Sequence, residues 1–195
     1  MNKDNILFSI TNYEKIIIEL PVPLISLHCC SEASIKFVHN KKNILLSSDS
    51  VRENMHVFNN LLTKALNAEL KLDSSISQDI GYLYNEELQD RPGLSYKKWE
   101  GREYWIGYDY KLWSYKYATW LYNDYKGSII LEITPMYDNL HDDTDDLVAQ
   151  KKYDNWKEYY FPYFIQNIPH EVAQEWLSQS QKILEIIELN IQRGN

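Results

Sequence analysis

The sequence predicts an α+β fold in which an antiparallel sheet is packed by a central helix, at about residues 50–71, and a long C-terminal helix, at about residues 169–191. Three observations support this class. Short apolar runs in the first quarter of the chain are separated by polar turns, as is typical of antiparallel strands. Apolar residues recur at helical spacing in the two segments named above. Residues 115–137 have the composition of a β-hairpin.

Two antiparallel strand pairs are predicted near the N-terminus. Each pair consists of short runs rich in β-branched and other apolar residues on either side of a polar turn. The predicted strands are residues 6–10, 15–20, 35–38 and 43–46. We therefore expect the N-terminal quarter to form antiparallel sheet.

The central helix has a recognisable start. Asp49 or Ser50 can cap it, and Glu53 follows Ser50 at the spacing of a capping box. Its apolar residues lie on one side of the helix. They are Val51, Met55, Phe58, Leu62, Ala65, Leu66 and Leu70.

A weaker helical pattern covers residues 76–89. Gly81 interrupts it, and the turn-forming residues 90–93 end it. The chain then becomes rich in aromatic residues, which favours a strand at about residues 103–108.

The hairpin at residues 115–137 leaves two registers open. A four-residue loop, residues 124–127, pairs Trp120 with Leu131. A three-residue loop, in which Gly127 is left-handed, places Trp120 beside Glu132 instead. In both registers Glu132 lies on the strand face opposite Leu131.

Two helices are predicted after the hairpin. Residues 153–161 form a short helix that ends before Pro162, and Pro169 opens the long C-terminal helix in its first turn. The apolar residues of this last helix form a wide stripe, so we expect it to pack on the sheet. They are Val172, Trp176, Leu177, Ile183, Leu184, Ile187 and Ile191.

Length and composition predict one globular domain, residues 1–195, with a change in composition near Leu94. The mean hydropathy of -0.50 and the broken apolar stretch at residues 16–27 predict neither a signal peptide nor a transmembrane helix. The two cysteines are adjacent, at 29 and 30, and so cannot join distant segments. A reduced, cytoplasmic setting is therefore expected.

Motifs of the common cofactor sites and nucleophilic enzymes are absent from the sequence. It contains no GxGxxG, GxxxxGK[ST], GxSxG or HExxH pattern. The acidic stretch at residues 138–146 lacks the glycine and the glutamate that a calcium-binding EF-hand loop requires. We expect no cofactor and no metal.

The formal net charge of -8 disfavours nucleic acid as a partner, because nucleic-acid binding needs basic patches. It suits a basic protein instead. Five aspartates between residues 138 and 146 would strengthen such an interaction. The partner-binding candidates combine these acids with hairpin residues. They are Tyr115, Tyr117, Glu132, Asp142, Asp143, Asp145 and Asp146.

Glu132 supports an alternative hypothesis. A carboxylate in an apolar strand, beside aromatic residues, could serve a hydrolase or a small-ligand site, with Asp109 or Asp124 as the second acid. It could equally face solvent on a one-sided sheet. Tyr110 and Trp113, with Tyr115 and Tyr117, are candidates for stacking on sugars or bases. A scaffold protein that self-associates through the C-terminal helix is a third hypothesis.

The segment YATWLYNDYKGSIILEITPMY, together with the small size, acidity and aromatic richness of the chain, resembles the immunity proteins that bacteria encode beside secreted polymorphic toxins. The resemblance implies an inhibitor without enzymatic activity that binds one toxin and covers its active site. Because nuclease toxins are usually basic around the active site, an acidic inhibitor with aromatic anchors has complementary chemistry.

Overall fold

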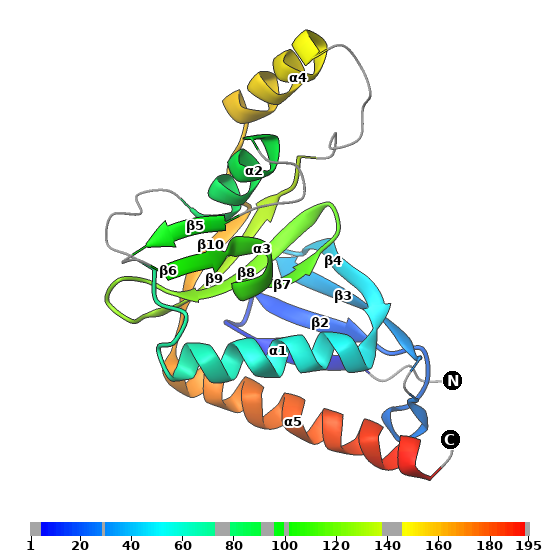
Figure 1. The fold of residues 1–195 in the computed structure, drawn as a ribbon. Coiled ribbons are helices and arrows are strands. Elements are labelled where there is room, and N and C mark those ends of the chain that lie inside the picture. Colours follow the sequence, from blue (N-terminus) through cyan, green and yellow to red (C-terminus); the bar gives the residue numbers. More distant parts are fainter. Residues whose placement is uncertain are drawn as a thin grey trace.

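The computed structural model describes residues 5–28, 30–72, 79–90, 96–99, 102–137 and 146–193. These residues form an α+β fold with two four-stranded antiparallel sheets, which confirms the predicted class. The α-helices of the described residues are α1 (Val51–Leu66), α2 (Ile80–Asp90), α3 (Ile106–Asp109), α4 (Asp146–Glu158) and α5 (His170–Gln192). Figure 1 shows α1 and α5 side by side at one end of the molecule, with α2 and α4 at the other end.

The first sheet contains the four predicted N-terminal strands in chain order. They are β1 (Asn5–Ser9), β2 (Lys15–Glu19), β3 (Glu32–His39) and β4 (Lys42–Ser50). Asn40 and Lys41 join β3 to β4, and both have positive φ angles, 49° and 65°, as a two-residue hairpin turn with right-handed twist requires. A 3₁₀ helix, η1 (Leu24–Ser26), lies between β2 and β3.

The central helix starts as predicted and ends earlier. Ser50 is the N-cap of α1, and its Oγ accepts a hydrogen bond from the Glu53 N–H at 3.4 Å. The helix stops at Leu66, and Asn123 of the second sheet binds the segment around this end. The Asn123 side chain donates to the Ala65 carbonyl at 2.9 Å and accepts from the Leu70 N–H at 3.3 Å.

The second sheet has the strand order β10-β9-β8-β7. Its strands are β7 (Lys111–Ser114), β8 (Tyr117–Asn123), β9 (Ile129–Pro135) and β10 (Phe164–Ile168). The loop between β8 and β9 has three residues, because the Asp124 N–H donates to the Ser128 carbonyl at 2.9 Å. Gly127 has a φ of 91°. The three-residue alternative is therefore confirmed, and Trp120 lies opposite Glu132.

Both faces of the second sheet are covered at β8 and β9. On one face the Trp113 ring contacts Phe58 of α1, with centroids 5.3 Å apart. On the other face Tyr84 of α2 contacts Trp120 at 5.0 Å. Figure 1 shows α2 and α1 on opposite sides of this sheet. The prediction of a solvent-facing Glu132 on a one-sided sheet is therefore wrong.

The aromatic segment after residue 95 is only partly a strand. A small hairpin forms from β5 (Tyr96–Trp99) and β6 (Arg102–Trp105), and α3 follows at once. The predicted strand at residues 103–108 is thus wrong in its second half. α3 lies close under α2, since a Cβ at Gly107 would stand 2.9 Å from the Tyr84 ring.

The long C-terminal helix starts where Pro169 predicts and packs on the first sheet and on α1. Pro169 is the N-cap of α5. The Trp176 ring contacts Phe8 of β1 at 6.0 Å and Phe58 at 5.9 Å. The Arg52 Nε donates to Glu188 Oε1 at 2.7 Å. These contacts fix α5 along its length.

Candidate functional site

Glu132 on β9 is fully buried, and both of its carboxylate oxygens accept hydrogen bonds from the protein. Oε1 accepts from the Gly81 N–H at 2.7 Å, and Oε2 accepts from the Ile80 N–H at 3.2 Å and the Tyr122 hydroxyl at 2.8 Å. Ile80 and Gly81 are the first residues of α2, whose N–H groups have no partner within the helix. Glu132 therefore joins β8, β9 and the start of α2.

Asp79 supports the same helix end from the solvent side. Its Oδ1 accepts the Tyr82 N–H at 2.7 Å, as an N-cap residue does, and it also accepts the Tyr160 hydroxyl. Tyr160 follows α4 in the chain, so the contact attaches the end of α4 to the start of α2. Two acids from distant segments thus stabilise one helix terminus.

Burial and charge raise the pKa of Glu132 from its ordinary value of 4.5 to about 8. Desolvation is the main cause, and the nearby charge of Asp79 adds to it. The three hydrogen bonds that the carboxylate accepts act in the opposite direction. Burial also raises the pKa of Tyr122 and of Tyr160, so both phenols remain protonated donors.

The hydrolase hypothesis placed Glu132 in an aromatic-lined pocket with Asp109 or Asp124. The acid whose charge acts on Glu132 is Asp79 instead. Tyr122 does contact the carboxylate, yet none of the Glu132 surface is exposed to a substrate. The geometry favours a structural role for this residue.

The predicted tyrosines differ in their exposure. Tyr115 is exposed, whereas the Tyr117 ring lies 5.6 Å from Tyr163 and is half-buried. Tyr110 and Trp113 belong to the buried core and cannot stack on a ligand, so that part of the stacking prediction is wrong.

The structure leaves the acidic stretch untested. Asp142, Asp143 and Asp145 lie outside the described residues, and Asp146 is the first residue of α4. Whether the acids lie beside Tyr115 and Tyr117 therefore stays a prediction.

One exposed apolar segment is not predicted by the sequence patterns. Between the start of α4 and β10, five large apolar side chains face solvent. They are Leu147, Val148, Tyr159, Phe161 and Ile165. We call residues 146–168 the α4–β10 segment. The run of aromatic residues at 159–164 is the signal in the sequence, but its first part lies in the helix predicted over residues 153–161, whereas α4 ends at Glu158.

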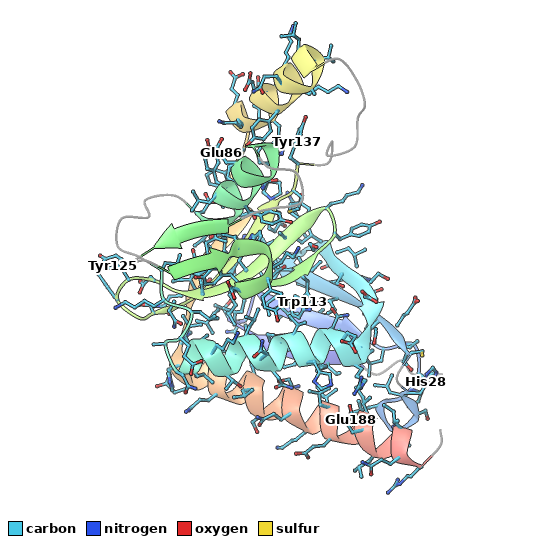
Figure 2. The ribbon with its side chains drawn as sticks, viewed as in Figure 1. His28, Glu86, Trp113, Tyr125, Tyr137 and Glu188 are labelled. Atoms are coloured by element: carbon cyan, nitrogen blue, oxygen red, sulfur yellow. The ribbon has the colours of Figure 1, made fainter. Side chains whose placement is uncertain are left out.

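The α4–β10 segment is held to α2 by an aromatic contact and an ion pair. The Tyr160 ring contacts the Tyr82 ring of α2, with centroids 5.4 Å apart. The Lys157 ammonium pairs with the Glu86 carboxylate at 2.5 Å. Figure 2 places Glu86 at the junction of α2 and α4. The exposed side chains therefore belong to a segment that is fixed to α2.

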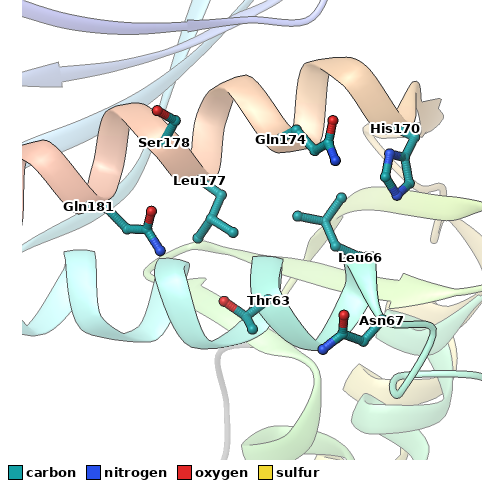
Figure 3. Close-up of a pocket in the computed structure, with 8 residues that line it drawn as sticks. All are labelled: Thr63, Leu66, Asn67, His170, Gln174, Leu177, Ser178 and Gln181. Carbon is teal, nitrogen blue, oxygen red and sulfur yellow. The ribbon is translucent and has the colours of Figure 1, made fainter.

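A groove of about 450 Å³ lies elsewhere, between α1 and α5 (Figure 3). Its polar wall consists of uncharged amides and hydroxyls, among them Asn67, Gln174 and Ser178, with His170 at one end. None of the predicted site residues lines it.

Metal-binding clusters and membrane-spanning helices are both absent from the described residues. No group of three or more His, Cys, Asp or Glu side chains in the described ranges could hold a metal ion. Among the same residues, no helix has the length and apolar character needed to cross a membrane. Comparisons of the chain with protein-family models, curated proteins and solved structures gave no match.

Proposed function

We propose that this protein is a binding module of the immunity type, which inhibits a cognate toxin by covering it. The observation that supports this function best is the exposed apolar α4–β10 segment on an otherwise acidic protein. Phe161 and Tyr159 are 79% and 75% exposed. Aromatic side chains are enriched at protein interfaces, where they supply much of the binding energy.

The exposed aromatic residues are held in position by contacts with α2. Because the Tyr160 hydroxyl bonds to Asp79 and the Trp156 ring packs beside Tyr160, the chain on either side of Tyr160 is fixed before a partner arrives. A partner then loses less free energy in ordering this surface. Truncation of an interface anchor of this kind typically costs about 2 kcal/mol or more.

Charge indicates the class of partner. The net charge of -8 favours a basic protein, and the acidic residues 138–146 precede Leu147 and Val148 directly in the chain. A toxin that acts on nucleic acid would be basic around its active site. Attraction between opposite charges speeds association and is screened by salt.

The alternative function, a hydrolase or ligand-binding protein that uses Glu132, has less support. It requires a carboxylate that a substrate can reach, whereas the Glu132 carboxylate is fully buried and bonds to groups of the protein itself. The raised pKa of Glu132 follows from burial in a helix–sheet contact. That contact explains the residue without catalysis.

The test is co-expression with the C-terminal domain of the protein encoded directly upstream of this one. We expect the pair to elute as one complex in size-exclusion chromatography, and the toxin domain to lose its toxicity when this protein is present. We also expect the complex to weaken as the salt concentration rises. A toxic upstream domain that neither binds nor is neutralised would refute the proposal.

A further inference from the structure

The outer strands of the two four-stranded sheets differ in how well they are protected against pairing with another chain. β4 and β7 contain charged residues, and a register irregularity occurs in each of their ladders. Charges and bulges are common devices that prevent an edge strand from pairing. β1 and β10 contain no charged residue and pair in unbroken register with their neighbours.

Among the described residues, β10 is the more open of these two strands. On β1, the Trp176 Nε1 of α5 donates to the Ser9 carbonyl at 3.1 Å, so α5 occupies one end of that strand. In the second sheet β10 is the last strand in the order, and β9 is the strand that pairs with it. The Ile165 and Asn167 side chains of β10 are exposed.

The core fixes β10 in position. Phe164 and Ile168 are buried, and the Phe164 ring contacts Phe37 of β3 at 4.7 Å. The other face of the strand presents Ile165, and the exposed Phe161 precedes the strand in the chain. Because β10 is already ordered as a strand and Phe161 lies next to it in the chain, binding a further strand costs little conformational entropy.

The charges around β10 indicate what it would accept. Glu158 and Glu171 are exposed and flank the strand in sequence, and residues 164–168 are neutral. Lys157, beside Glu158, is paired with Glu86 of α2. Because β10 itself is uncharged, it suits an apolar partner strand. Because the residues on either side of it are acidic, that strand is expected to come from a basic protein. A second copy of this chain would bring like charges together, because each copy has a net charge of -8.

We propose that β10 accepts a β-strand from the basic partner protein and thereby extends the second sheet. The inference rests on the proposed function and specifies how the partner binds. Main-chain hydrogen bonds would supply affinity, and apolar contacts with the exposed Ile165 and Phe161 side chains would supply specificity.

The experiment compares two matched lysine variants in the complex with the upstream C-terminal domain. Ile165→Lys places a charge on β10, and Leu7→Lys places the same charge on β1; the two side chains are 48% and 45% exposed. We expect Ile165→Lys to weaken binding by about tenfold or more and Leu7→Lys to leave it within about twofold. Hydrogen exchange of residues 164–168 should slow in the complex, while that of residues 5–9 should not change.

The outcomes separate this inference from the proposed function. If the complex forms but Ile165→Lys binds like the unmodified protein, or exchange at residues 164–168 does not slow, strand addition is wrong and the function stands. If the free protein sediments as a dimer with residues 164–168 already protected, a second copy occupies β10 and the inference is also wrong. If no complex forms, the proposed function and strand addition at β10 are both wrong.

Discussion

Gly81 and Thr134 lie so close together that a Cβ atom on residue 81 would stand 2.0 Å from the Thr134 Oγ1 atom. This proximity allows the Gly81 N–H to reach Glu132 Oε1 at 2.7 Å. The Thr134 hydroxyl is itself held by the Trp120 Nε1, which donates to it at 2.8 Å. The start of α2 can therefore bind the sheet only if residue 81 has no side chain.

The first prediction is that Gly81→Ala destabilises the protein by about 2 to 3 kcal/mol, because the added methyl group must push α2 away from β9. Urea denaturation of the variant would measure this loss. Gly127→Ala is the control, since no atom lies within 4 Å of the position that its Cβ would take and its φ of 91° is the remaining cost. That cost should be about 1 to 2 kcal/mol. A smaller loss for Gly81→Ala than for Gly127→Ala would contradict the contact.

The second prediction concerns pH. The pKa of Glu132 is about 8 in the folded protein and near its ordinary value of 4.5 in the unfolded chain. Between these values the folded protein retains a proton that the unfolded chain has lost, so the free energy of unfolding falls as the pH rises from about 4.5 to about 8, then levels off. Glu132→Gln removes this titration and should flatten that part of the profile.

Urea midpoints of the unmodified protein and Glu132→Gln, measured from pH 5 to pH 8.5, would test this expectation. The difference between the two profiles isolates Glu132 from groups that titrate in both proteins. Asp79 and Tyr122 face Glu132 and remain present in both. Parallel profiles would show that Glu132 does not bind a proton more tightly in the folded state.

The third prediction is a stabilising change at the end of α1. Ala68 has a φ of 56°, and the Ala68 and Glu69 N–H groups donate to the Ala65 and Lys64 carbonyls. This is the Schellman arrangement, in which glycine is the preferred residue at the left-handed position. Ala68→Gly should raise the free energy of unfolding by about 0.5 to 1 kcal/mol, the strain of the left-handed alanine less the entropy of glycine. Thermal denaturation would detect the gain, and Ala65→Gly within α1 should instead lower stability by about 1 kcal/mol or more.

Local patterns were sufficient where local chemistry determines structure. The N-cap at Ser50 and Pro169 at the start of α5 each act within a few residues, and the structure has both. The Ser50 N–H donates to Asp49 Oδ1 at 2.7 Å, where a capping box would use Glu53. The left-handed Gly127 belongs to one of the two registers that the sequence leaves open. Gly81 shows the opposite case. In the sequence Gly81 indicates an interruption of a weak helix, because no local pattern shows that Thr134, 53 positions away, requires the missing side chain.

The same limit applies to the candidate site. The strand pattern shows that Glu132 is on the face opposite Leu131, but whether that face is covered depends on where α2 packs. β10 was not predicted, because its five residues lie between Pro162 and Pro169 and their pairing with β9 is set by distant contacts. The open edge of β10 follows from its place at the end of the strand order.

The fourth prediction tests the proposed interface. Phe161→Ala should weaken binding to the upstream toxin domain by about 2 kcal/mol, because it removes an exposed aromatic anchor beside β10. Its thermal stability should change little, since the ring is 79% exposed. Tyr13→Ala is the matched control: Tyr13 is 72% exposed but lies in the turn between β1 and β2. Isothermal titration calorimetry with both variants would measure the effect. Equal affinity of Phe161→Ala and the unmodified protein would place the interface elsewhere on the molecule.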